Sequence, residues 1–216
     1  MIDVRFALYL AGSLLVGMSA REFARASTAS RLHDPTPRLW GRLTFSPKVW
    51  FEPFGSGLLP ALILLLWGVG ASFLPPPVAY GKPAPVDPNY FRNRTRDTIS
   101  VSLAGPIANL ALAAIGGFAL RAGIVGEVGL IALAFMLANL SLLVFHLLPI
   151  PGLDGARMVA LVLPPRAAEV YRNADQYLPL FVLIVLFLFG GPLISIVNSL
   201  TDSLCRLLSG FPCPPL

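Results

Sequence analysis

The chain has 216 residues, of which 56% are hydrophobic and only 12% are charged, and its formal net charge is +5. A soluble globular domain has about twice this share of charged residues, so the composition excludes an ordinary soluble domain and indicates an integral membrane protein. The basic residues lie between apolar runs and form no basic face. This argues against nucleic-acid binding and favours contacts with lipid headgroups.

The first apolar run, residues 4–26, predicts a membrane-spanning helix that ends in the sequence Arg21-Glu22-Phe23-Ala24-Arg25. On a helix, Arg21 and Arg25 share one face and Glu22 lies beside Arg21. Each charge in a membrane-spanning helix costs about 2.5 to 3.5 kcal/mol even on the lenient insertion scale, so such charges usually mark a function or a partner. This cluster is therefore the first candidate site.

A polar connector follows over residues 27–54, and a second apolar run covers residues 55–74. Within the connector, residues 39–46 alternate between apolar and polar side chains, and Trp40 and Trp50 are suited to the membrane interface. This pattern predicts a short β-hairpin at the membrane edge. Residues 75–97 are rich in proline and predict an extended or turning loop before the third span.

The third and fourth apolar runs, residues 98–120 and 124–148, contain Asn109, Asn139 and His146. We expect the two asparagines to hydrogen-bond between helices and His146 to be a packed, neutral side chain near a helix end. After the fourth run, two prolines and two glycines surround Asp154. Such a sequence breaks a helix, and broken helix at membrane depth is tolerated only where protein or a cavity surrounds it. Asp154 is therefore expected to point into the bundle.

A fifth run covers residues 177–200, so the sequence predicts an all-α integral membrane protein. We expect one domain over residues 1–216, without a soluble domain, built as a bundle of five transmembrane helices, or six if the fourth or fifth region splits. With five spans, eight basic residues lie on the N-terminal side and six on the other, which slightly favours a cytoplasmic N-terminus. Cys205 and Cys213 can pair if the C-terminus faces an oxidising compartment, and the sequence leaves this open.

Five sequence blocks follow a known pattern in the same order. Gly-Arg-Leu-Thr-Phe-Ser-Pro at residues 41–47 is similar to Gly-Arg-Leu-Thr-Leu-Asn-Pro, and Leu-Leu-Pro-Ile-Pro-Gly-Leu-Asp-Gly at residues 147–155 is similar to Leu-Leu-Pro-Ile-Pro-Pro-Leu-Asp-Gly. The other blocks are residues 52–60, 81–86 and 104–109. In these blocks the chain resembles the site-2 proteases, the zinc-dependent intramembrane metalloproteases, in their compact bacterial branch without a PDZ domain.

The resemblance implies a site whose key positions have changed. In the family, the first helix carries His-Glu-x-x-His, in which two histidines hold zinc and the glutamate is the general base, and the aspartate of the Asp-Gly motif is the third ligand. Carried over by position, the histidines become Arg21 and Arg25, the base becomes Glu22 and the third ligand remains Asp154. A guanidinium has no free lone pair and keeps its proton, so it cannot ligate a metal. We therefore predict no catalytic residue and no cofactor.

The four charges of this site sum to zero, because Arg21 and Arg25 face Glu22 and Asp154. We expect a charge-assisted network across the bundle in the structural place of zinc, with Asp154 paired to Arg21 or Arg25. Two other interpretations stay open at this point. Glu22 is a solvated relic at a helix end, or the two arginines extend to the headgroup layer.

An active enzyme is the alternative. His146 stands where the family has an asparagine, and with Asp154 it can supply two ligands of a rebuilt zinc site; the only other histidine is His33, in the first connector. The alternative is thus an active intramembrane zinc metallopeptidase with a non-standard ligand set. A small transporter or channel is a third alternative, but no inverted repeat is visible in the sequence.

The resemblance and the altered motif together predict a catalytically inactive pseudoprotease. We expect it to act as a scaffold or accessory subunit of a membrane protein complex, with other integral membrane proteins and lipid as its partners. Its expected location is the bacterial cytoplasmic membrane, as a multi-pass protein.

Overall fold

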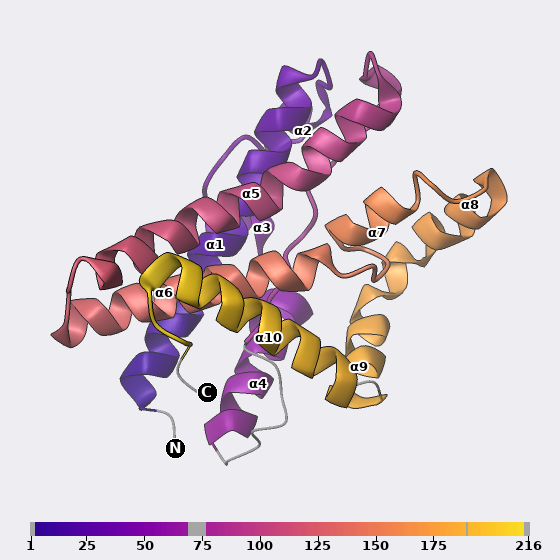
Figure 1. Ribbon diagram of the computed structural model, residues 1–216. Coiled ribbons are helices and arrows are strands. Elements are labelled where there is room, and N and C mark those ends of the chain that lie inside the picture. Colours follow the sequence, from indigo (N-terminus) through magenta and orange to yellow (C-terminus); the bar gives the residue numbers. More distant parts are fainter. Residues whose placement is uncertain (1–2, 69–76, 189, 214–216) are drawn as a thin grey trace.

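A computed structural model gives the structure of the chain and describes residues 3–68, 77–188 and 190–213 (Figure 1). Every regular element within these ranges is helical. In chain order the elements are α1 (Val4–Arg31), α2 (Thr36–Leu39), α3 (Pro47–Trp50), η1 (Pro53–Leu58), α4 (Leu59–Gly68), η2 (Pro88–Tyr90), α5 (Arg94–Arg121), α6 (Gly126–Leu147), α7 (Asp154–Val159), α8 (Pro165–Asn173), η3 (Ala174–Tyr177), α9 (Leu178–Leu188) and α10 (Gly190–Ser209). Here η1 is a π-helix, and η2 and η3 are 3-10 helices.

One face of α1 faces the core along most of its length. Leu10, Leu14 and Met18 recur every four residues and are almost fully buried, as a single helix face requires. The same face continues through Arg21 and Arg25, which are also buried. The charges therefore lie on the side of α1 that packs against the rest of the protein.

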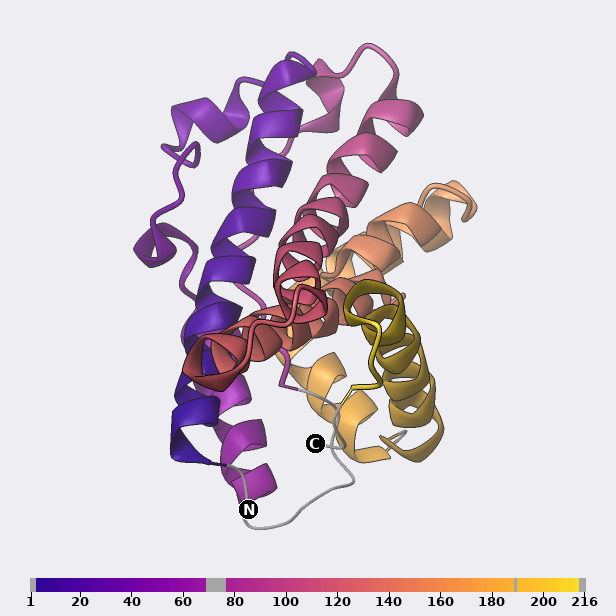
Figure 2. The ribbon, with the colours of Figure 1, turned by 60° about the vertical axis from the view of Figure 1, so that its left-hand side comes forward.

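α5 and α6 follow each other through a short connection and pack against α1 (Figures 1 and 2). Leu10 and Leu14 of α1 share one apolar cluster with Leu137 and Leu140 of α6, and Leu208 of α10 closes it. α5 and α6 also approach each other closely. A Cβ placed on Gly116 would lie 2.6 Å from the backbone oxygen of Ala132, so this contact depends on the absence of a side chain.

We expect Gly116→Ala to lower the free energy of unfolding by about 1 to 3 kcal/mol, because the new methyl group must push the α6 backbone away. Gly12→Ala is the matched control, since a Cβ on Gly12 meets nothing within 4 Å. Alanine in a helix interior is about 0.5 to 1 kcal/mol more favourable than glycine, so this control should gain stability. Denaturant unfolding of both variants in one detergent checks the prediction, and a Gly116→Ala variant as stable as the control would contradict it.

Residues 77–87 are an extended segment that leads to η2. Alternate backbone amides of this segment donate hydrogen bonds: Tyr80 N–H to Gly55 O at 3.0 Å and Lys82 N–H to Trp50 O at 2.8 Å. The next, Ala84 N–H, donates to a side-chain oxygen of Glu22 at 2.9 Å. Because neighbouring residues of an extended chain point to opposite sides, these three amides lie on one side of the segment. The segment thus brings a backbone donor to the charges of α1.

The predicted β-hairpin over residues 39–46 is wrong, because no strand occurs in the part of the chain that the structure describes. The first residues of this segment complete α2 and its turn, and Arg42 N–H donates to Pro37 O at 2.8 Å. Further on, the indole N–H of Trp50 donates to Thr44 O at 2.9 Å. Local partners occupy these backbone groups, so the alternating sequence does not pair with a second strand.

The predicted bundle of five to six transmembrane helices is also wrong. Within the described ranges, two helices, α5 and α6, are long and apolar enough to cross a membrane. The second apolar run forms the short helices η1 and α4, and its residues 69–74 lie outside the described residues. The fifth run is divided between α9 and α10. α1 is long enough, but its charged residues reduce its hydropathy.

Candidate functional site

Four charged side chains form a buried cluster where α1 meets α7. Arg21, Glu22 and Arg25 come from neighbouring turns of α1, and Asp154 is the first residue of α7. Each of the four is at most 3% exposed. The structure thus brings together the four residues that the sequence singled out. Their burial excludes a solvated Glu22 and excludes arginines that extend to a headgroup layer.

Both arginines bridge the two carboxylates. Arg21 donates from Nη1 to Glu22 Oε1 and from Nη2 to Asp154 Oδ2. Arg25 donates from Nη1 to Glu22 Oε2 at 2.9 Å, and its Nε lies 3.2 Å from Asp154 Oδ1. Arg157, at the edge of the cluster, places its Nη1 3.4 Å from the same Oδ1 of Asp154. The four charges therefore form a closed network of ion pairs, which α5 passes at Gly105.

The carboxylates of this network have no oxygen left without a cationic partner. Glu22 meets Arg21 through Oε1, and its Oε2 accepts from both Arg25 and the amide of Ala84. Buried charges are costly unless opposite charges and hydrogen bonds compensate them. Because this carboxylate already accepts from three donors, it is not free to take a proton from a water molecule, which a general base must do.

Asp154 reaches the cluster because the start of α7 packs closely against the end of α6. A Cβ on Gly155 would collide with the backbone oxygen of Leu147 and would lie 2.5 Å from that of Leu148. A residue without a side chain is therefore required at this position. In the Asp-Gly pair, Asp154 supplies the carboxylate that pairs with the two arginines. Gly155 allows the close packing of α7 against α6 that brings this carboxylate to them.

We expect Gly155→Ala to lower the free energy of unfolding by about 3 kcal/mol, at the upper end of overpacking costs, because the obstacles are backbone atoms. The same change should move Asp154 away from the two arginines. Thermal unfolding in detergent, followed by intrinsic fluorescence, measures the first effect. Unchanged unfolding would show that α7 does not approach α6 as closely as described.

The cluster forms one wall of a cavity of about 210 Å³. His146, which the sequence singled out, lines this cavity as well. The remaining polar lining residues were not predicted from the sequence: Glu52, Tyr80, Lys82, Arg157 and Asp175. Three of them carried a signal. Glu52 and Lys82 each belong to one of the five sequence blocks, and Arg157 lies three residues after Asp154 on the same helix.

Two lining groups outside the apolar helices have altered acidity. Burial raises the pKa of the Asp175 carboxyl, although the hydrogen bond from Gly152 N–H at 2.7 Å and the charge of Arg25 act in the opposite direction. Burial also raises the pKa of Tyr80, and the nearby Glu52 adds to the effect. Tyr80 is therefore a neutral phenol at physiological pH.

His146 is buried. Its Nδ1 lies 2.9 Å from Leu142 O, which assigns the proton to Nδ1 and leaves a lone pair on Nε2. His33 lies beyond the end of α1, is exposed and does not line the cavity. The ligand set His33, His146 and Asp154 is thus not assembled, although His146 and Asp154 share one cavity.

The two predicted asparagines lie outside this cavity. Asn139 donates to Phe135 O of its own helix at 2.8 Å, and its Oδ1 packs close to Gly17 of α1. Asn109 is fully buried in α5, and its side chain has no hydrogen-bond partner among the described residues. The expected hydrogen bonds between helices are therefore wrong for both residues: Asn139 bonds within α6 and Asn109 has no partner among the described residues. Asn139 packs at the α1–α6 contact, and neither residue takes part in the charged cluster.

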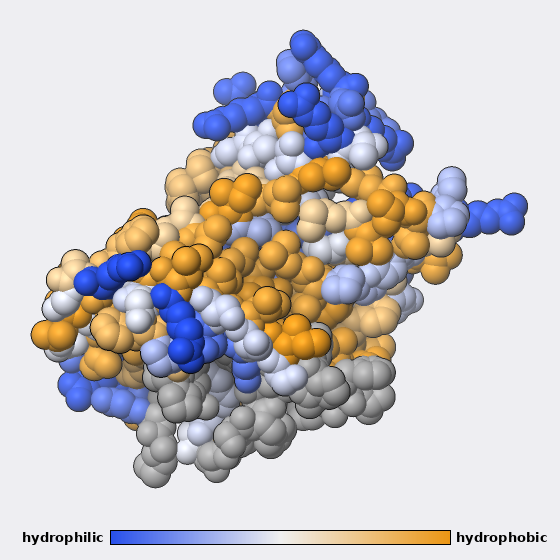
Figure 3. All heavy atoms as spheres, viewed as in Figure 1, coloured by the Kyte–Doolittle hydropathy of each residue, from blue (hydrophilic) through white to orange (hydrophobic). Residues whose placement is uncertain are grey.

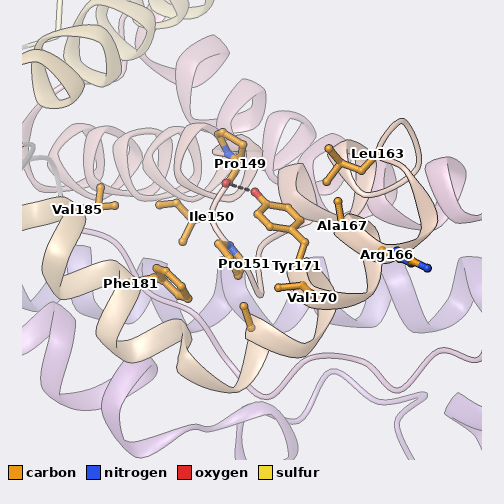
Figure 4. A pocket seen from close by; sticks show the side chains of 11 residues that line it. Pro149, Ile150, Pro151, Leu163, Arg166, Ala167, Val170, Tyr171, Phe181 and Val185 are labelled. Atoms are coloured by element: carbon orange, nitrogen blue, oxygen red, sulfur yellow. Dashed lines mark hydrogen bonds between the residues drawn. The ribbon is translucent and has the colours of Figure 1, made fainter.

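A second cavity, of about 770 Å³, lies on the other side of the loop that precedes α7 and is almost entirely apolar. Pro149 and Pro151 of the loop, Val170 and Tyr171 of α8 and Phe181 of α9 surround it (Figure 4). The Tyr171 hydroxyl donates to the backbone oxygen of Pro149 and ties α8 to the loop. We refer to this cavity as the apolar groove.

Comparison with known proteins finds relatives over most of the chain. YwhC of Bacillus subtilis, named "putative zinc metalloprotease", is 32% identical over 225 residues, which cover 96% of this chain and 94% of that protein. Rip2 of Mycobacterium tuberculosis, with the same description, is 37% identical over 188 residues, covering 85% of this chain and 67% of that protein. The chain belongs to the site-2 protease family. The resemblance inferred from the five blocks is thereby confirmed. No family model and no solved structure matches the chain.

These names correct the prediction that the chain has no cofactor. Its relatives are named zinc metalloproteases, so zinc is the group that membership of the site-2 protease family implies. The prediction rests on Arg21 and Arg25, which cannot ligate a metal, and it treats a zinc site built from other residues only as the alternative. Family membership also agrees with association with a membrane through the apolar helices α5 and α6.

The residues at the family's metal position do not fit zinc. Arg21 and Arg25 offer N–H donors where lone pairs are needed, and they engage Glu22 and Asp154. Within the described ranges, no group of three histidine, cysteine or acidic side chains is placed to hold a metal ion. The described residues at this position therefore disagree with the zinc that the relatives' names imply.

Proposed function

We propose that this chain is a non-proteolytic member of the site-2 protease family that holds an apolar segment of another membrane protein. It would serve as a scaffold or accessory subunit of a membrane complex, as a multi-pass protein of the bacterial cytoplasmic membrane. The observation that carries the proposal is the closed ion-pair network at the family's catalytic position. Glu22 and Asp154 are the two acids of the family's site that this chain retains, and both form ion pairs with Arg21 and Arg25.

The apolar groove supports the binding part of the proposal. Its lining side chains come from the loop before α7, from Leu163 just before α8, and from α8, η3 and α9 (Figure 4). Arg166 is the one charged residue among those that the structure describes in this lining. A polar segment of a soluble protein would find few hydrogen-bond partners in this groove. An apolar membrane segment, in contrast, can fill a groove of this composition by van der Waals packing. The groove also lies next to the charged cavity, since both are lined by residues of the same loop.

A crosslinking experiment tests the binding function. A photoreactive amino acid at position 170, in the groove, should capture a membrane segment of a partner in native membranes, and Val170→Asp should abolish co-purification of that partner. Val162→Asp is the matched control, because Val162 is similarly exposed but does not line the groove. Crosslinks to lipid alone, or a partner that survives Val170→Asp, would contradict the proposal.

The relatives' names favour a second candidate, an intramembrane zinc metallopeptidase with a non-standard ligand set. His146 and Asp154 share the cavity and are the lone-pair donors from which such a set would start. Zinc analysis and cleavage of a transmembrane peptide by the purified chain distinguish the candidates. Stoichiometric zinc and cleavage, both lost in Asp154→Asn and in His146→Ala, would establish the peptidase and overturn the non-proteolytic function.

A further inference from the structure

Most of the charged residues outside the charged cavity lie at two ends of the molecule, whereas Lys48 and the charged residues of α8 lie elsewhere. The first, which we call the cationic end, comprises residues 31–42 and 87–97, that is, the end of α1, α2, η2 and the start of α5. Asp87 N–H donates to Asp34 Oδ2 at 2.9 Å and joins its two segments. The second, the terminal end, comprises the start of α1, the α5–α6 connection and the end of α10 (Figures 1 and 2).

The cationic end has unpaired positive charge. It carries six arginines and three aspartates, a net charge of +3, and none of these arginines takes part in an ion pair within the described ranges. The arginines are Arg31, Arg38, Arg42, Arg92, Arg94 and Arg96. The carboxylates of Asp34, Asp87 and Asp97 all accept backbone N–H groups of the same end, and Asp34 and Asp97 are buried. Among the described residues, these guanidinium groups therefore have no acidic side chain as an ion-pair partner.

The terminal end is electrically balanced. Arg5, Arg121 and Arg206 stand against Asp3, Glu127 and Asp202, so the charges sum to zero. Arg5 lies 3.6 Å from Glu127, and Arg206 lies 2.9 Å from Asp202. Since α5 runs from Arg94 at the cationic end to Arg121 at the terminal end, a membrane that α5 crosses separates the two.

Apolar side chains accompany the arginines at the cationic end. Leu39 and Trp40, which follow Arg38, are 78% and 68% exposed. Figure 3 shows hydrophilic residues gathered over α2 and the start of α5, with an apolar band beside them over the middle of the molecule. Exposed tryptophan and arginine next to an apolar band are typical of a surface at the headgroup level of a bilayer.

From this charge distribution we infer that the cationic end binds anionic phospholipid headgroups of the cytoplasmic leaflet and that the terminal end faces the opposite compartment. Unpaired arginines next to a membrane-crossing helix are attracted to anionic lipids of that leaflet. The disulfide between Cys205 and Cys213 at the terminal end is an independent second observation. Disulfides persist in oxidising compartments, which the cytoplasm of most bacteria is not.

This inference differs from the orientation expected from a five-span sequence. In that arrangement, the loop over residues 75–97 was counted on the side of the N-terminus. In the structure, Phe91 near the end of this loop packs with Ala29 of α1 and Val101 of α5, at the opposite end from Arg5. The arginines of residues 92–96 therefore join those of residues 31–42 instead of adding to the N-terminal side.

Tryptophan quenching tests the lipid contact. Trp50 and Trp67 are at most 5% exposed, so Trp40 is the tryptophan that lipid can reach. The protein is placed in bilayers of phosphatidylcholine and phosphatidylglycerol in which one lipid at a time carries bromine, a quencher of tryptophan fluorescence. We expect brominated phosphatidylglycerol to quench Trp40 about five times more than brominated phosphatidylcholine. This preference is the one that a single arginine near an anionic surface provides. The variant Trp40→Phe identifies the signal.

Two charge variants complete this test. Arg92→Gln/Arg94→Gln/Arg96→Gln should reduce the preference, whereas Arg5→Gln/Arg121→Gln/Arg206→Gln, with as many changes at the terminal end, should leave it intact. Equal quenching by both lipids would overturn the inference. Protection of Trp40 from both lipids would also overturn it, because a protein would then cover the surface.

Cysteine labelling tests the orientation. Thr95 and Ala122 are exposed and lie next to opposite ends of α5. In intact bacterial cells, a membrane-impermeant maleimide should label Ala122→Cys, and it should label Thr95→Cys only after lysis. Native Cys205 and Cys213 should remain unlabelled until reduction. The reverse pattern would overturn the inference, and none of these readouts depends on proteolysis or on a partner.

Discussion

Asp154→Ala is expected to lower the free energy of unfolding by about 3 to 5 kcal/mol, the cost of removing one partner from a buried ion pair. Asp154 is 1% exposed and faces Arg21, Arg25 and Arg157. Without its carboxylate, Arg21 and Arg25 have Glu22 as their remaining acidic partner. The buried cluster then carries an uncompensated positive charge.

Denaturant unfolding in a single detergent measures this loss, with expression level as a second readout. The matched control is Arg206→Ala, which breaks the pair with Asp202 at the surface, where the arginine side chain is 63% exposed. Exposed pairs contribute about 0 to 1 kcal/mol, so this control should behave almost like the original chain. If both variants unfold alike, Asp154 does not compensate the arginines.

A charge-neutral double variant separates the loss of an ion pair from general damage to the core. Arg21→Met/Asp154→Leu removes one cation together with one anion and leaves Arg25 with Glu22, which are 2.9 Å apart. Apolar replacement of a complete buried pair is often neutral or stabilising. We therefore expect the double variant to be more stable than Asp154→Ala alone. A loss equal to the sum of the single losses would show that the residues do not interact.

The four charges were predictable because two simple regularities place them. Arg21 and Arg25 are one helical turn apart, and the Asp-Gly block identifies Asp154 across 133 residues of chain. The contact between Ala84 and Glu22 was not predictable in the same way. It depends on the path of residues 77–87, and a proline-rich sequence predicts an extended chain but not its direction.

The predicted number of membrane-spanning helices was wrong for a related reason. Hydropathy reports the length of an apolar run and not whether one straight helix fills it. Residues 55–68 are apolar throughout most of their length, yet they form η1 followed by α4, and Glu52 caps η1 through the amide of Gly55. Likewise, alternation over residues 39–46 predicts a strand only if a second segment can pair with it, and the pairing depends on tertiary structure.

Arg21→His/Arg25→His is expected to create a chain whose stability depends on zinc. The change removes the two fully buried cations of the cluster and leaves Glu22 and Asp154 buried with an excess of negative charge. A divalent cation would restore the balance, and two imidazoles one turn apart with the carboxylate of Asp154 form a ligand set that suits zinc. Without metal, the variant should be less stable than the original chain, because two buried carboxylates lose Arg21 and Arg25, their main cationic partners.

Zinc titration with thermal unfolding measures the effect. A ligand that binds only the folded state adds about 2.7 kcal/mol when its concentration is a hundredfold above its dissociation constant, so the melting temperature of the variant should rise with zinc more than that of the original chain. Addition of Asp154→Asn to the double change weakens one of the three ligands and should suppress most of this rise. If zinc leaves the double variant unchanged, then positions 21, 25 and 154 do not converge on one point, and the geometry of the charged cluster would have to be abandoned together with its interpretation as an altered metal site.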